Sequence, residues 1–246
     1  MNINITEYPN SYAEVKLEKS ESIIAEKGSF IFSDGEFISE NKLELNSYKN
    51  ILAKLGGKSL SYVSYEAKES LSLVLGTRDN CELTLIEISK DNPILIKADA
   101  HFARSSNVEI KLLDTKITEI FDSGFWMNVY GEGFLILKGY GKILKMNIDN
   151  DKPLLIEDAS LIAMEERIDF NTVDVKISDE LKEFLKSGVE APYSIKGNGV
   201  IWLQTKGKYA IQEWFNFHYR YTGKVIFIED FQPALGAGGR EFESLH

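Results

Sequence analysis

The residue types that could bind a metal ion are few and widely separated in this sequence. The chain has three histidines in 246 residues, and they are His101, His218 and His246. A cupin, a β-barrel metal enzyme with three histidine ligands and one glutamate, needs a His-x-His pair on one strand, and a zinc site needs three or four protein ligands. We therefore expect no metal site. His101 is expected to pack in the core, and His218 to form hydrogen bonds at a surface or an interface.

Nucleophiles and acid–base pairs are equally sparse. Cys81 is the single cysteine, which excludes an intramolecular disulfide, and no nearby histidine or lysine lowers the pKa of its thiol, so we expect a small buried residue at a strand start. There is no Gly-x-Ser-x-Gly motif and no Cys–His pair. The carboxylates at 157–158 and at 165–166, the latter followed by Arg167, are expected at solvated strand ends, since acid–base catalysis would need them to converge in space. We expect no catalytic residues, no cofactor and no enzymatic activity.

Two Gly-x-Gly stretches, at Gly131-Glu-Gly133 and at Gly197-Asn-Gly199, are the other candidates for chemistry. A phosphate-binding loop is a glycine-rich turn that leads into a helix. Both stretches lead instead into apolar strands, at residues 134–137 and 200–203. We therefore expect turns between antiparallel strands, in which glycine supplies a positive φ angle.

Three segments share one pattern: an aliphatic strand, a turn residue and a second apolar strand. They lie at residues 22–31, 95–102 and 155–162, and their turn residues are Gly28, Asp99 and Ala159. His101 falls in the place that Phe30 and Leu161 hold in the other two segments, which is why we expect it to pack. Self-similarity at a regular spacing predicts a repeat architecture.

The elements around these segments predict a mostly β domain over residues 1–205, built from a threefold internal repeat of antiparallel β units. The expected units are about 15–87, 88–146 and 147–205. Each unit also has a capping side chain, an apolar stripe and a terminal glycine, which predict short connecting helices at about 47–56, 114–124 and 178–188. Further turns are expected at 33–35, 78–80, 91–93 and 149–153.

The C-terminal part of the chain departs from the repeat. Residues 206–232 are expected to form an appended aromatic β-hairpin, with five aromatic side chains between Trp214 and Tyr221. Such a segment is expected either to cover an open strand edge of its own chain or to join chains together. Residues 233–246 have the composition of a linker and are expected to form a flexible tail, of the kind that cloning leaves behind.

The overall charge limits the partners. Lys plus Arg total 28 and Asp plus Glu total 38, so the formal net charge is −10. An acidic surface without a basic cluster repels nucleic acid and anionic membranes, so we expect no nucleic-acid binding.

The N-terminus lacks the features of a signal peptide, and no apolar run approaches the ~20 residues of a membrane span, so we expect a cytoplasmic protein without direct membrane insertion.

Residues 21–28, the helix-to-strand joins at Gly57, Gly124 and Gly188, and residues 197–205 carry a family resemblance. Over about residues 3–205 the chain resembles the altered-inheritance-of-mitochondria, or mitochondrial-biogenesis, family, whose domain is classed with the tryptophan RNA-binding attenuation protein fold. The resemblance implies an attenuation-protein-like β-sandwich or prism and a homo-oligomer, for which a trimer is one option. It implies a role in mitochondrial membrane organisation in eukaryotes, and a prokaryotic member here, since the chain lacks a transit peptide. It brings no catalytic residues.

These observations lead to two functional hypotheses. The first is a non-enzymatic oligomeric scaffold that binds an unknown protein or small ligand on a β surface. The alternative is a cupin-like metal-dependent enzyme that uses His101 with carboxylates from other strands. RNA binding, by analogy with the attenuation-protein fold, conflicts with the net charge of −10.

Overall fold

The structure is a computed structural model that describes residues 1–7, 11–42, 61–77, 81–112, 126–172 and 193–206. The expectation of a mostly β fold is confirmed, because the elements of these ranges are strands and two short 3₁₀ turns. The predicted helices at 47–56, 114–124 and 178–188 lie outside the described residues, as do the turn at 78–80 and the predicted hairpin and tail beyond residue 206. The described strands belong to one compact unit, Met1–Gly207.

In the first set of strands, β7 (Leu71–Gly76) alternates buried and half-buried side chains, with Leu71, Leu73 and Leu75 buried. Its members are β1 (Asn2–Ile5), β2 (Tyr12–Leu17), β3 (Ser22–Glu26), β4 (Phe30–Ser33), β5 (Phe37–Lys42), β6 (Tyr62–Ala67) and β7 (Leu71–Gly76). β7 pairs with β2 and β4, and β6 pairs with β3 and β5, all antiparallel. β1 adds to the free side of β2.

The second set contains six strands. They are β8 (Cys81–Ile88), β9 (Ile94–Lys97), β10 (His101–Ser105), β11 (Val108–Leu112), β12 (Trp126–Gly131) and β13 (Gly133–Tyr140). β13 pairs with β8 and β10, and β12 pairs with β9 and β11. The expected boundary between residues 87 and 88 therefore falls inside β8.

The third set has fewer but longer strands. They are β14 (Ile143–Ile156), β15 (Leu161–Glu165), β16 (Asp169–Thr172) and β17 (Tyr193–Gln204), and β17 pairs with the other three. The turn predicted at 149–153 is wrong, because β14 continues through it with a register shift between Asn150 and Leu154. The turn predicted at Gly197–Gly199 is also wrong, because β17 runs straight through these residues. The expected unit boundary at 146/147 lies inside β14.

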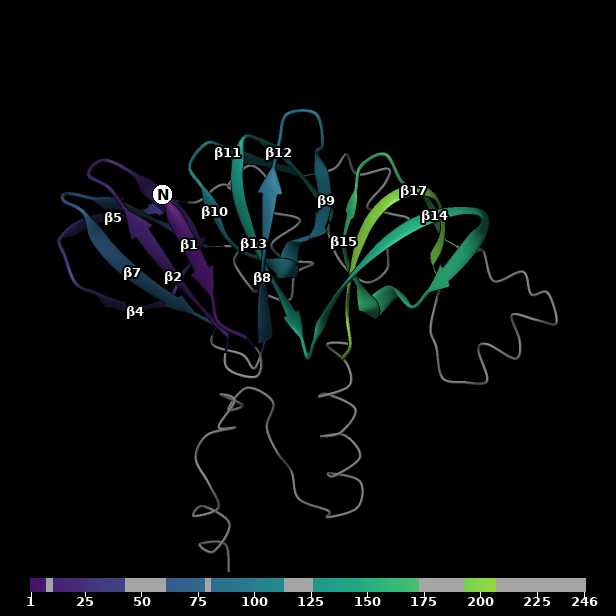
Figure 1. Ribbon diagram of the computed structural model, residues 1–246, viewed down its shortest axis with the longest axis horizontal. Coiled ribbons are helices and arrows are strands. Elements are labelled where there is room, and N and C mark those ends of the chain that lie inside the picture. The colour runs from purple at the N-terminus through teal and green to yellow at the C-terminus, as the bar shows by residue number, and fades with distance from the viewer. Residues whose placement is uncertain (8–10, 43–60, 78–80, 113–125, 173–192, 207–246) are drawn as a thin grey trace, which may run out of the picture. The chain divides into compact units, whose positions relative to one another are not determined.

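The strands form three sheets that combine neighbouring sets (Figure 1). The four-stranded sheet has the order β1-β2-β7-β4, the six-stranded sheet β5-β6-β3-β10-β13-β8, and the seven-stranded sheet β11-β12-β9-β15-β17-β14, with β16 also on β17. The first set is thus joined to the second by β3·β10, and the second to the third by β9·β15. Three clusters of buried side chains form the core.

The predicted turn residues lie between strands, but most of the strands they connect are not hairpin partners. Gly28, with φ +86°, connects β3 and β4 of different sheets, and Asp99 lies in a 3₁₀ turn (Ala98–Ala100) before β10. Ala159 lies in a second 3₁₀ turn (Asp158–Ser160), and the β14 and β15 on its two sides pair with β17 instead of each other. Gly131 and Gly133 have the predicted positive φ, yet they connect β12 to β13 of another sheet.

Candidate binding surface at the edge of the first sheet

The described residues contain no group of three or more histidine, cysteine, aspartate or glutamate side chains that could hold a metal ion. His101, the only predicted candidate in this part of the chain, begins β10 and is 2% exposed. Its ring lies edge-on to Tyr62, with the centroids 4.7 Å apart, and neither ring nitrogen has a hydrogen-bond partner. The prediction of a packing residue is confirmed. Burial, and then the charges of Arg104 and Lys138, hold the pKa of His101 well below its usual value.

Replacing His101, the first residue of β10, with leucine, the residue that begins β15 at position 161, is expected to stabilise the protein, and more so in acid. At pH 8 the gain should be about 1–3 kcal/mol, because a buried polar ring without partners is removed. In the wild type the lowered pKa means that the unfolded chain takes up a proton first as the pH falls through 6.5, so stability is lost there. The gap between the two proteins should then widen by up to about 1.4 kcal/mol per pH unit.

Urea unfolding of both proteins at pH 8, 6.5 and 5.5 measures this gap. If the difference in unfolding free energy between the two proteins is the same at all three pH values, His101 binds protons equally in the folded and unfolded states over this range, which contradicts the prediction.

The other reactive residues serve structural contacts. Cys81 is buried at the first position of β8, as predicted. The prediction of a solvated strand end is wrong for Glu165, which is buried and accepts hydrogen bonds from Asn92 Nδ2 at 2.9 Å and Arg167 Nε at 2.9 Å. It is correct for the neighbouring Glu166, which is exposed. Glu157 accepts a hydrogen bond from the Ser160 hydroxyl at 2.7 Å.

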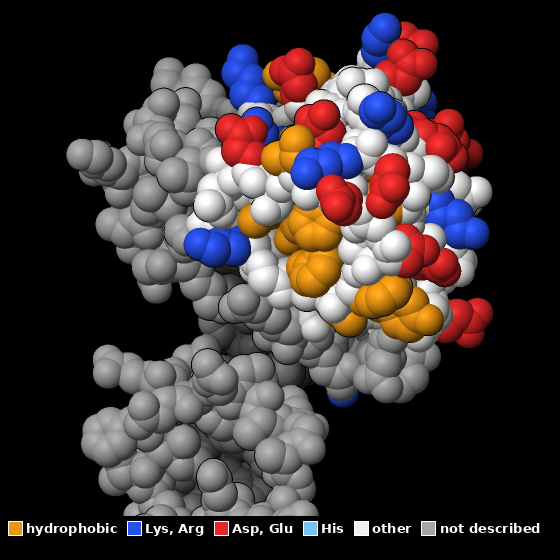
Figure 2. Space-filling model, turned by 90° about the vertical axis from the view of Figure 1, so that its left-hand side faces the viewer, with side chains coloured by type: hydrophobic (Ala, Val, Ile, Leu, Met, Phe, Trp, Pro, Cys, Tyr) orange, Lys and Arg blue, Asp and Glu red, His pale blue; other side chains and the backbone are white. Residues whose placement is uncertain are grey.

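Exposed apolar side chains gather on β4, an edge strand of the four-stranded sheet. Phe30, Ile31 and Phe32 are consecutive and all exposed, and we call them the apolar edge. Ile38 on β5 is exposed as well. Figure 2, which faces this end of the strands, shows hydrophobic side chains gathered between charged ones. Sequence reasoning missed this surface, although three successive apolar residues place apolar groups on both faces of a strand, a usable signal.

The apolar edge is anchored by an aromatic cluster. The ring centroid of Phe30 lies 5.5 Å from that of Phe37 and 6.2 Å from that of Tyr65, and the rings of Phe37 and Tyr65 meet edge-on at 5.6 Å. Tyr65 is buried in the first core cluster. Such ring pairs add to the stabilisation from apolar burial. Phe30 is therefore held in place from the core side while part of its ring faces solvent.

The backbone of β4 can also form hydrogen bonds with a further strand on one side. Within the described residues β4 pairs with β7 alone, with a register shift between Phe30 and Phe32. An edge strand presents unpaired N–H and C=O groups, and an apolar one is a template for pairing with another strand. The edge can therefore bind by strand addition combined with apolar contacts, which is recognition chemistry and not catalysis.

The described part of the chain has no helix that is long and apolar enough to cross a membrane.

Among solved structures, an X-ray structure of a Streptococcus pyogenes protein from a structural-genomics programme has a TM-score of 0.67 with this chain at 17% sequence identity. The match covers 89% of this chain and 99% of that protein, and it establishes a shared fold. No curated protein matches the sequence. The family model described as mitochondrial biogenesis AIM24 matches residues 3–206, so the chain belongs to this family.

Proposed function

We propose that this protein is a non-enzymatic oligomeric scaffold, built from three copies of one strand unit, that binds a protein or small ligand through an exposed β surface. The observation that carries this proposal is the apolar edge of β4, where exposed phenylalanine and isoleucine side chains coincide with a strand edge that no described strand pairs with. Contiguous exposed apolar surface typically marks an interaction site.

The strand pairings support the three-copy interpretation. β2·β7, β3·β6, β4·β7 and β5·β6 in the first set correspond to β8·β13, β9·β12, β10·β13 and β11·β12 in the second. In the third set one long strand, β17, replaces two. Its first half pairs with β16 and the end of β14, as β12 pairs with β11 and β9, and its second half pairs with the start of β14 and with β15, as β13 pairs with β8 and β10. The same register shift follows Phe30, His101 and Leu161, the first residues of β4, β10 and β15. We infer units of about 12–76, 81–140 and 143–204, and an attenuation-protein-like architecture remains part of this proposal.

The charged groups also support a structural role. Three ion pairs tie elements of the fold together. Glu165 contacts Arg167 at 2.7 Å just after β15, Glu26 on β3 contacts Lys138 on β13 at 2.6 Å across the intervening β10, and Glu82 on β8 contacts Lys142 at 2.5 Å. The family description suggests a link to the organisation of membranes or organelles, and we propose a cytoplasmic location for this member. The cupin-like alternative would need carboxylates beside His101, and the described residues contain no group of three or more histidine, cysteine, aspartate or glutamate side chains that could hold a metal ion.

Light scattering on the full chain, combined with elemental analysis, tests the proposal. We expect one defined mass that is a multiple of 27.9 kDa over a tenfold range of concentration, without a stoichiometric transition metal. A monomer at all concentrations would contradict the oligomeric scaffold. One bound transition metal per chain would favour the metal-dependent enzyme.

A further inference from the structure

We propose that copies of this chain join head to tail, with the free edge of β4 in one copy paired antiparallel with the free edge of β14 at Leu154–Ile156 in the next. The inference rests on the proposed function, because it names the surfaces through which the scaffold assembles. Inside the chain, the strand pairs β3·β10 and β9·β15 each connect one set of strands to the next, and we call each such pair a joint. The inference follows from these two joints and from the edges of β4 and β14, which have no such partner among the described strands.

The two internal joints have the same register. In the first, Ala103 and Arg104 of β10 lie opposite Ala25 and Ile24 of β3. In the second, Ala163 and Met164 of β15 lie opposite Ile96 and Leu95 of β9. In both, the third and fourth residues of a short strand pair with the second strand of the preceding inferred unit, β3 or β9.

The open ends supply the two halves of a third joint. β4 holds the place of β10 and β15, and it has only β7 beside it among the described strands. The end of β14 holds the place of β3 and β9, since Leu155 precedes its 3₁₀ turn by three residues, as Leu95 does. The same register would set Phe32 opposite Ile156 and Ser33 opposite Leu155. Pro153, which has no N–H to donate, lies just outside this stretch.

The pattern of burial agrees with this assignment. Ile31 is 59% exposed, whereas Phe102 and Ile162, its counterparts in the internal joints, are buried. On the other side, Leu155 is 41% exposed, whereas its counterparts Ile24 and Leu95 are buried. Both open ends thus expose the apolar positions that the internal joints cover.

The core clusters are incomplete at the same place. Phe102 and Ala103 of the second set complete the first cluster, and Ile162 and Ala163 of the third set complete the second. The third cluster receives no side chain from a following set among the described residues, and Leu154 is only partly buried against it. Ile31 and Phe32 of another copy would occupy the place that these pairs fill elsewhere.

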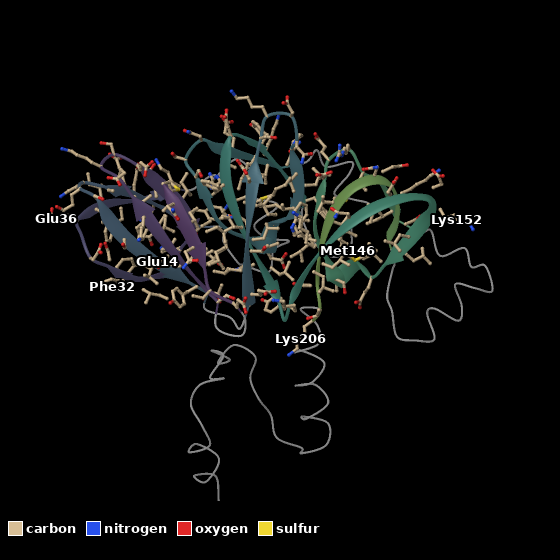
Figure 3. The ribbon with its side chains drawn as sticks, viewed as in Figure 1. Glu14, Phe32, Glu36, Met146, Lys152 and Lys206 are labelled. Atoms are coloured by element: carbon tan, nitrogen blue, oxygen red, sulfur yellow. The ribbon has the colours of Figure 1, made fainter. Side chains whose placement is uncertain are left out.

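The two edges are different surfaces, so the joint is heterologous, and we propose that it closes into a ring, which has the one defined mass that the proposed function requires. Figure 3 places Phe32 on β4 and Lys152 on β14 at opposite ends of the described strands. The edge of β4 therefore meets the β14 edge of another copy and not that of its own chain.

Two single substitutions separate the halves of the joint. Ile31→Glu blocks the β4 edge and Leu155→Glu blocks the β14 edge, and both positions are exposed in the single chain. Ile38→Glu is the matched control, since Ile38 is 53% exposed on the neighbouring β5. We expect each edge variant to be monomeric by light scattering, and the control to keep the wild-type mass. An equal mixture of the two edge variants should give a dimer, because each retains the half that the other lacks.

Three outcomes would contradict these expectations, and they differ in meaning. A monomeric wild type would overturn the proposed function together with the joint. It would indicate instead that another part of the same chain covers the edge of β4. A wild-type oligomer whose mass neither edge substitution changes would overturn the joint alone. Edge variants that stay monomeric when mixed would overturn the head-to-tail arrangement.

A covalent cross-link tests the register without disturbing the fold. The double variant Ser33→Cys with Leu155→Cys should form a ladder of disulfide-linked multimers on oxidation, while Cys81 stays buried. Each single variant should yield no ladder. An oligomer that gives no ladder with the double variant would overturn the proposed pairing.

Discussion

Replacing Phe102 with alanine is expected to lower the free energy of unfolding by about 3–5 kcal/mol, as is typical when a large core side chain is removed. Phe102 is fully buried, and it belongs to the cluster formed mainly by residues of the first set. Its loss would leave a cavity where the first and second sets meet. Because both sets share this cluster, we expect a single unfolding transition, measured by urea denaturation followed by circular dichroism.

Ile31→Ala is the matched control for this prediction, since Ile31 holds the same place in β4. In a dilute monomer its side chain is exposed, so the free energy of unfolding should change by less than about 0.5 kcal/mol. Equal losses for both variants would contradict the burial difference. The edge variant Leu155→Glu provides the monomeric background for the comparison.

Much of the strand content could be predicted from the sequence, because its signals are local. The alternation at residues 82–88 predicts a strand, and β8 spans Cys81–Ile88. The segments around Gly28, Asp99 and Ala159 contain a strand, a turn and a strand, as predicted. Backbone preferences of glycine also act locally, and Gly131, Gly133 and Gly197 all have positive φ.

The pairing of the strands could not be predicted from the same signals. Gly197-Asn-Gly199 has the composition of a turn, but β17 stays extended there because it pairs with β14 along its whole length. Glu165 stands in a charged stretch, but it is buried because Asn92, far away in the sequence, packs beside it. Both outcomes depend on contacts between residues that are distant in the chain.

The candidate surface was missed for a related reason. Phe30 and Ile31 fall in the predicted second apolar strand of the segment 22–31, and a strand of this composition is normally buried. The run of three apolar residues is a local signal for apolar groups on both faces of the strand, but their exposure follows from the position of β4 at the end of its sheet. Phe102 and Ile162, the second residues of β10 and β15, are buried, and these two strands lie inside their sheets, so position in the sheet accounts for which of these short apolar strands is covered.

Gly131→Ala is expected to lower the free energy of unfolding by about 2–5 kcal/mol. The residue has φ +116°, which strains any L side chain by about 1–2 kcal/mol. A Cβ atom there would also collide with the carbonyl oxygen of Asn107, which belongs to the backbone and cannot turn aside as a side chain would. Overpacking of this kind costs about 1–3 kcal/mol more.

Gly197→Ala separates the two causes, because Gly197 has a similar φ of +122° but open space around it. The nearest atom to an added Cβ is the backbone nitrogen of Asp169, at 4.0 Å. This variant should therefore lose only the strain, about 1–2 kcal/mol. Urea unfolding of both variants gives the difference between them, which measures the collision alone. Equal losses would mean that the loop at Asn107 shifts at no cost, and that backbone strain is the whole reason for glycine at both positions.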